Sequence, residues 1–138
     1  MEPAAVKIKA MPRVNYFAVP ADVPERAINF YQEVFGWQFE VGWEYDTPQG
    51  REKYWHVTTD DGSSAGINGS LTRREYPGQS ISVGIEVPAV DVCTDLVEKS
   101  GGKALVSRVA IPGVAWFAVC QDSEGNTFAI IQPDPAAR

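Results

Sequence analysis

The sequence predicts an α+β protein in which two tandem βαβββ modules pair into one continuous, curved mixed sheet. Two observations support this prediction. A strand–helix–strand pattern at 14–41 returns in a looser form from residue 81 onward, and a glycine-containing hairpin signal follows each copy, at Gly62 and Gly125. Modules of about 60 residues are too small for each to bury a helix-covered sheet alone, so we expect them to share one sheet.

The first copy opens with a short, apolar strand at Val14–Val19. Asp22 and Glu25 form a capping-box-like helix start, with Pro24 in the first turn. Apolar side chains then recur at helical spacing until Gly36, which is expected to end the helix in a left-handed conformation.

The other strands of the first copy follow in order. Residues 37–41 alternate apolar and polar side chains, which is the pattern of a half-buried strand. A charged turn at 46–53 leads into a strand at 54–59, and a hairpin at 60–62 precedes a glycine-rich strand at 63–71. The polar segment 72–79 contains Pro-Gly and is the expected linker.

The second copy repeats this order. A strand at 81–87 precedes a helix at 92–99 that Asp91 can cap, and strands are expected at 103–109, 114–121 and 126–132. We therefore predict a single domain over 1–138, with module one at 13–71, a linker at 72–79 and module two at 80–132. Residues 1–12 and Pro133–Arg138 are predicted to be loosely held termini.

Composition narrows the functional classes. A net charge of −6 and a pI near 4.7 argue against nucleic-acid or anionic-membrane partners. Only two cysteines are present, which indicates reduced thiols in a cytoplasmic protein rather than a disulfide framework. The sequence has no apolar run of about 18 residues, so we expect a soluble chain.

Three motifs carry a family resemblance: AVPADVPERAINFYQEVFGW, AGINGSL and IPGVAWFAVCQDSEGNTFAI. Together with the repeated βαβββ order, they resemble the vicinal oxygen chelate superfamily, which includes glyoxalase I, extradiol dioxygenases, fosfomycin resistance enzymes and bleomycin-binding proteins. The resemblance covers about 14–132 and is greatest to short glyoxalase-like proteins of unassigned reaction. It implies an eight-stranded sheet with a concave cleft, and usually a homodimer.

Where this family has metal chemistry, the resemblance implies a divalent ion held by His or Glu at one inward position in each of four strands. Carried onto this sequence, those positions are Tyr16, Gly66, Gly84 and Ala129. None is a usual ligand, and the one histidine, His56, does not fall on any of them. We therefore expect no metal and no other cofactor.

Small residues at these positions predict a roomy cleft for a small organic molecule. The alternative is a packed core in which tryptophans refill the space, namely Trp37, Trp43, Trp55 or Trp116. Tyr16 has two interpretations of its own. It can offer a phenol at the cleft floor, or it can be an aromatic residue that fills the space of the missing ligand.

His56 is the best candidate for a general base, because histidine ordinarily titrates near neutral pH. Strand alternation places it on the face of Tyr54 and Thr58, although a single strand histidine is more often structural. Glu86 can bind a cation or abstract a proton if it points into the cleft, or it can simply face solvent. Asn68 and Gln132 are possible amide contacts, or they can satisfy backbone groups instead. The predicted ligand-binding set is Tyr16, Tyr54, His56, Asn68, Glu86 and Trp116.

These residues leave three hypotheses for function. The first is a metal-independent protein that binds a small organic molecule in the cleft, as a homodimer. The second is a metal-free acid–base enzyme, such as an isomerase, hydrolase or lyase, which uses His56, Tyr16 or Glu86. The third is an accessory interaction module whose cleft is closed.

Overall fold

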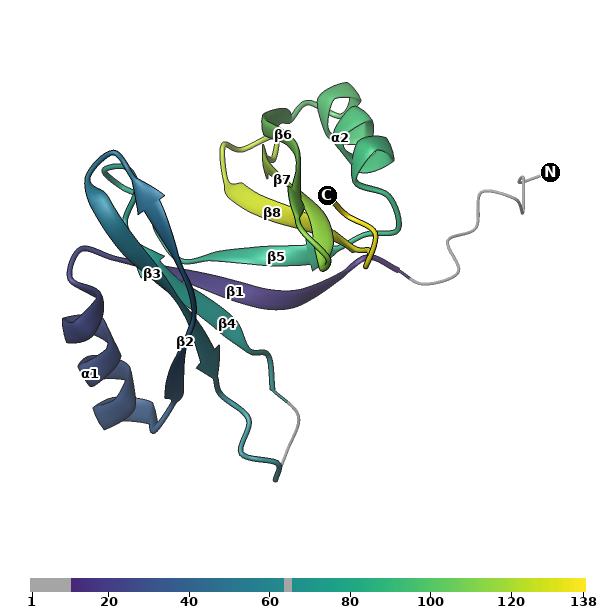
Figure 1. Cartoon of the computed structure of the whole chain (residues 1–138). Coiled ribbons are helices and arrows are strands. Elements are labelled where there is room, and N and C mark those ends of the chain that lie inside the picture. The colour runs from purple at the N-terminus through teal and green to yellow at the C-terminus, as the bar shows by residue number, and fades with distance from the viewer. Residues whose placement is uncertain (1–10, 64–65) are drawn as a thin grey trace. The chain divides into compact units, whose positions relative to one another are not determined.

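The computed structural model describes residues 11–63 and 66–138 (Figure 1). Within these residues, eight strands and two helices follow each other as two βαβββ modules. The first module contains β1 (Arg13–Ala21), α1 (Pro24–Phe35), β2 (Gln38–Thr47), β3 (Gly50–Thr58) and β4 (Gly69–Arg73). The second contains β5 (Ser82–Glu86), α2 (Val90–Lys99), β6 (Lys103–Ile111), β7 (Ala115–Gln121) and β8 (Thr127–Pro133). The predicted α+β class and the repeated order are confirmed.

The strands of the first module lie in the order β2-β3-β4-β1. β1 runs parallel to β4, while β2 with β3 and β3 with β4 are antiparallel, so the sheet is mixed as predicted. In the second module the order is β5-β8-β7-β6, with antiparallel pairs between β6 and β7 and between β7 and β8.

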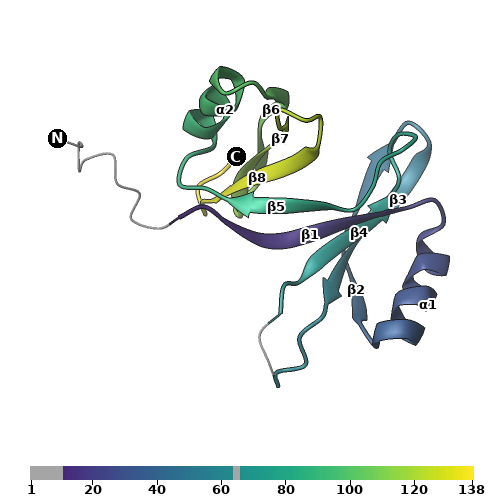
Figure 2. The ribbon, with the colours of Figure 1, turned by 180° about the vertical axis from the view of Figure 1, so that it is seen from behind.

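Helix α1 covers one face of the first-module strands, and we call this the helix face (Figures 1 and 2). Ile28 of α1 packs there against Val19, Val57 and Leu71, all of which are buried. Because successive strand residues point to opposite faces, the neighbours of these residues point the other way. We call that second surface the open face; the described part of the first module places no helix on it.

The predicted side-chain caps are wrong for both helices. Val23 is the N-cap of α1 and makes no side-chain cap bond, because the Asp22 carboxylate instead accepts a hydrogen bond from Arg74 Nε at 2.8 Å. In α2, the Gln132 Oε1 atom accepts a hydrogen bond from the Val90 N–H group at 2.9 Å, while Asp91 forms an ion pair with Arg108. Both helix starts are therefore set by tertiary partners rather than by local capping boxes.

The end of α1 is as predicted. Pro24 stands in its first turn, and Gly36 adopts a left-handed φ of 72° directly after the helix. A residue with a Cβ atom is strained in that conformation, which explains the glycine.

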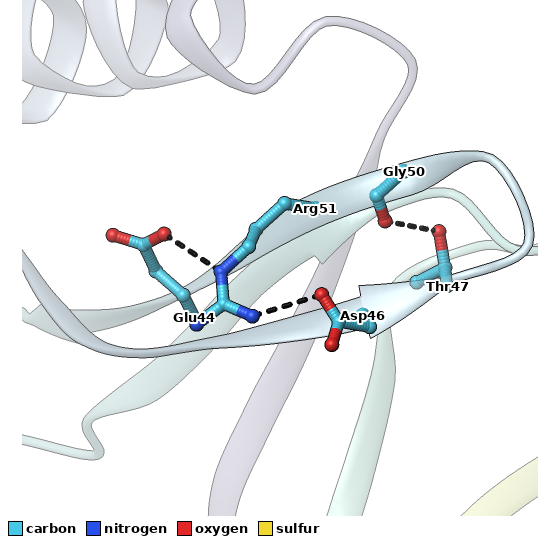
Figure 3. A network of polar contacts seen from close by, with 5 residues as sticks. All are labelled: Glu44, Asp46, Thr47, Gly50 and Arg51. Atoms are coloured by element: carbon cyan, nitrogen blue, oxygen red, sulfur yellow. Dashed lines mark hydrogen bonds and ion pairs between the residues drawn. The ribbon is translucent and has the colours of Figure 1, made fainter.

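The hairpin of β2 and β3 is longer than the sequence predicts, because most of the expected turn at 46–53 is strand. Figure 3 shows the contacts at its end: Arg51 lies 3.3 Å from Glu44 and 2.8 Å from Asp46, and the Thr47 hydroxyl donates to the Gly50 carbonyl oxygen at 2.8 Å. Ion pairs this exposed contribute little to the free energy of unfolding, so we assign them to strand register rather than to stability.

The strand predicted at 63–71 begins only at Gly69. The residues before it form a loop, in which the Thr59 N–H group donates to Asn68 Oδ1 at 2.9 Å and the Thr59 hydroxyl donates to the Ile67 carbonyl oxygen at 2.7 Å. The apolar residues of this segment suggested strand pairing despite its glycines, but these side-chain bonds satisfy the backbone without it. Residues 64–65 of the predicted strand lie outside the described residues.

The C-terminal segment is held firmly, so the prediction of a loose end is wrong there. The Asp134 N–H group donates to the Val114 carbonyl oxygen, the Gly113 N–H group donates to that of Ala137, and Ala137 is fully buried. Residues 1–10 of the other predicted loose end lie outside the described residues. Neither helix is long and apolar enough to cross a membrane, among the residues that the structure describes.

Candidate functional site

A β-bulge in β2 brings Trp43 to the open face. Val41 lies opposite Trp55, which belongs to the helix face, whereas Trp43 lies opposite Tyr54, and Gly42 is the extra residue between them. The Trp43 and Tyr54 rings stack with centroids 3.9 Å apart and planes 9° apart. Trp43 remains 43% exposed, so a flat aromatic surface faces solvent.

His56 lies beside this stack. Its imidazole is 5.9 Å from the Trp43 ring centroid and 5.3 Å from that of Tyr54, edge-on to both. The ring also lies over Gly42, where an added Cβ atom would stand 2.5 Å from His56 Nε2. The side chain is exposed, as a general base or a ligand contact requires.

Tyr16 of β1 also belongs to this aromatic group, since its phenol lies near that of Tyr54. Its ring fills the space above Gly84, where an added Cβ atom would lie 1.7 Å from Cε1. Burial, and secondarily the nearby Tyr54 phenol, raise the pKa of Tyr16 to about 12. Tyr16 is therefore a neutral phenol at physiological pH, able to donate a hydrogen bond but not to act as a ready anion.

We expect spectrophotometric titration to detect a phenol with a pKa near 12, and Tyr16→Phe to remove that step from the curve. The folded-state pKa of Tyr16 lies above the ordinary value of 10.0. The contribution of its neutral phenol to the free energy of unfolding is therefore complete below pH 10 and is lost as pH rises toward 12. The Phe variant should therefore lose less stability than the parent chain over this range. An unchanged titration curve in Tyr16→Phe would contradict the assignment.

Ser70 of β4 is the buried polar member of the group, at 4% exposed. Its hydroxyl hydrogen-bonds with the Tyr54 phenol oxygen; burial raises the pKa of Tyr54, and this bond offsets part of that rise. Ser70 also lies opposite His56 in the pairing of β3 with β4. We refer to the five side chains on this face as the open-face cluster: Tyr16, Trp43, Tyr54, His56 and Ser70.

The structure thus brings together three members of the predicted set, Tyr16, Tyr54 and His56. Sequence reasoning missed Trp43 and Ser70 as members. For Trp43 the only signal was a glycine directly before an aromatic residue in a strand, which is typical of a bulge. Ser70 carried no signal of its own.

The other predicted site residues have partners of their own. Asn68 is in the loop before β4, where its side chain accepts from the Thr59 N–H group. Glu86 forms an ion pair with Arg13 at 3.1 Å. Trp116 packs on the core beneath α2, donates its indole N–H to Asp134 at 3.0 Å, and lies under the Arg108 guanidinium at 4.2 Å.

The amino-acid sequence from residue 13 to residue 130 matches the family model of the Glyoxalase/Bleomycin resistance protein/Dioxygenase superfamily. The chain belongs to this superfamily. A glyoxylase-like domain-containing protein from Didymella fabae is 29% identical over 119 residues, which cover 86% of this chain and 91% of that protein.

Solved structures agree on the fold of this superfamily member. A hypothetical protein from Bacillus halodurans C-125 matches with a TM-score of 0.64 at 14% identity, covering 94% of this chain and 99% of the other. Methylmalonyl-CoA epimerase from Mycobacterium tuberculosis matches with a TM-score of 0.55 at 15% identity, covering 90% and 88%. A methylmalonyl-CoA epimerase in complex with methylmalonyl-CoA and NH4+ gives 0.59 at 13% identity, covering 93% and 99%. At these identities the likeness concerns the fold.

The residues at the family's metal positions do not fit a metal ion. Tyr16 is a neutral phenol, Gly84 and Ala129 carry no donor atom, and Gly66 lies in a loop rather than in a strand. The Tyr16 ring also occupies the space that a side chain at 84 would need. Among residues 11–63 and 66–138, no three His, Cys, Asp or Glu side chains gather as a metal site.

Proposed function

We propose that this protein binds a small organic molecule on the open-face cluster without using a metal ion. The observation that carries the proposal is the exposed stack of Trp43 on Tyr54, with His56 exposed beside it. Large aromatic side chains left on one sheet face offer a flat apolar surface, and a few polar groups around them can orient a ligand. We further propose that the chain acts as a single glyoxalase-like domain, as a cytoplasmic homodimer.

The cluster favours a flat ligand with a hydrogen-bond acceptor. Trp43 supplies the stacking surface, the neutral Tyr16 phenol supplies a donor, and the His56 imidazole can donate or accept. None of the five cluster members is Lys or Arg, and the chain carries a net charge of −6, so an anionic ligand would lack a counter-charge.

We expect a screen of neutral and cationic aromatic compounds by thermal shift to yield ligands that raise the melting temperature by mass action. Trp43→Ala should weaken their binding at least tenfold, or about 1.4 kcal/mol, because the stacking surface is lost. Tyr76→Ala is the matched control, since Tyr76 is 48% exposed and lies outside the cluster. Ligands whose affinity does not change in Trp43→Ala would refute this site.

The exposure of His56 beside a neutral phenol also supports a second candidate, a metal-free acid–base enzyme. His56→Gln keeps hydrogen bonding but cannot take up a proton near neutral pH. For an enzyme, this variant should lose turnover while it retains ligand binding and melting temperature. For a binding protein, the variant should retain the parent's affinity and no turnover should be seen in either.

A further inference from the structure

The helix face of the first module carries a cavity of about 300 Å³ that lies apart from the open-face cluster. Its walls come from β1, from α1 and the turn after it, from the loop between β3 and β4, and from the segment just before β5. Val19, on β1, forms its floor and points away from the open face, into the core under α1. The cavity and the cluster thus lie on opposite faces of one sheet.

Three aromatic side chains line the cavity: Phe17, Tyr31 and Trp37. Trp37 stacks on Tyr31 with centroids 5.1 Å apart and planes 7° apart, and lies 5.5 Å from the Phe17 centroid. All three pack on the first-module core, yet each is only half-buried. The core is therefore uncovered at this point, and apolar area that a ligand could bury remains in contact with water.

The polar groups of the cavity are already satisfied by the protein. Thr59 donates its hydroxyl to the Ile67 carbonyl oxygen and its N–H to Asn68 Oδ1. No Asp, Glu, Lys or Arg is among the described lining residues. A charged ligand would lose its hydration there without gaining a partner, which is costly.

Two isoleucines stand at the mouth, where Ile67 is 44% exposed and Ile81 is 57% exposed. Branched apolar side chains at that exposure add further surface for an apolar ligand. A volume of about 300 Å³ lies at the lower end of the range for small-molecule pockets, which limits the ligand to one or two rings.

We propose that this cavity is a second binding site, which takes a neutral, flat, apolar molecule of one or two rings. The stacked aromatic wall selects a flat shape, the satisfied polar groups select neutrality, and the volume sets the size. Since the site lies on the helix face, its occupation is independent of the ligand proposed for the open face.

The test uses the neutral fluorescent probe 1-aminonaphthalene, which is flat and has two fused rings, and the whole 138-residue chain. We expect saturable binding of one probe per chain, with methyl contacts to Val19 detected by nuclear Overhauser effects. Ile81→Trp and Ile67→Trp place a ring across the mouth and should weaken binding at least tenfold. Val34→Trp is the matched control, because Val34 is 53% exposed on α1 and does not line the cavity.

Trp43→Ala separates this proposal from the proposed function. It should leave probe binding unchanged even though it removes the open-face stack. The proposal would be overturned by probe binding that is not saturable or that survives both mouth variants. It would also be overturned if binding fell equally in Val34→Trp or was lost in Trp43→Ala. One further result would overturn the proposal: the parent chain is a dimer that does not bind the probe, and a mouth variant dissociates that dimer. A second copy of the chain would then occupy the cavity.

Discussion

Gly84→Ala should lower the free energy of unfolding by about 2–3 kcal/mol, because the new methyl group enters the space of the Tyr16 ring. The added Cβ atom would lie 1.7 Å from Cε1 and 2.1 Å from Cζ, so the whole ring must leave its position. The displaced ring then exposes apolar surface that is half-buried in the parent chain. Urea unfolding of the parent and the variant measures the loss.

A double-mutant cycle shows whether the clash is the cause. Tyr16→Ala alone also destabilises the chain, but it frees the space above Gly84, so the combined variant should lose at least about 1 kcal/mol less than the two single losses together. Gly66→Ala is the control, since its added Cβ atom would lie 3.1 Å from the Thr59 hydroxyl oxygen and no nearer than 3.6 Å to Asp60. Strict additivity of the two changes would contradict the close contact.

Removal of residues 134–138 should lower the free energy of unfolding by about 2–4 kcal/mol, through the loss of interior hydrogen bonds and of buried apolar surface. The lost interactions are the backbone bonds of Asp134 to Val114 and of Gly113 to Ala137, together with the fully buried Ala137 side chain. The Trp116 indole N–H also loses its acceptor. Urea unfolding measures the change, and Trp116 fluorescence should shift to longer wavelength as the indole becomes hydrated.

Removal of Arg138 alone is the control for that truncation. Arg138 is exposed, so its loss should change the free energy of unfolding by less than about 0.5 kcal/mol. A truncation of 134–138 as mild as this control would show that the second module does not depend on its C-terminal segment.

The order of strands and helices was predictable because each element is determined by its own local sequence pattern. Apolar side chains at helical or strand spacing, with Gly36 after the first helix, identify elements without knowledge of their partners. Helix caps were not predictable in the same way. Asp22 bonds to Arg74, 52 residues away, and the N–H group of Val90 bonds to Gln132, 42 residues away. Long-range partners of this kind leave no local pattern.

Part of the candidate site followed from alternation alone. Tyr54 and His56 share the open face because they are two residues apart in an unbroken strand. Gly66 was placed in a strand because its neighbours are apolar, but Thr59 and Asn68 hold that segment as a loop. Tyr16 was given two interpretations; its ring does take the space beside Gly84, and its phenol remains a proposed hydrogen-bond donor.

The bulge at Gly42 has a consequence for how this protein can change. Deleting that one residue would restore regular alternation in β2 and leave Trp43 opposite Tyr54, because the pairing on both sides of the bulge is unchanged. In a regular strand, by contrast, the loss of one residue reverses the face of every residue beyond it. The bulge is therefore the point at which β2 can lose a residue and keep its aromatic surface on the open face.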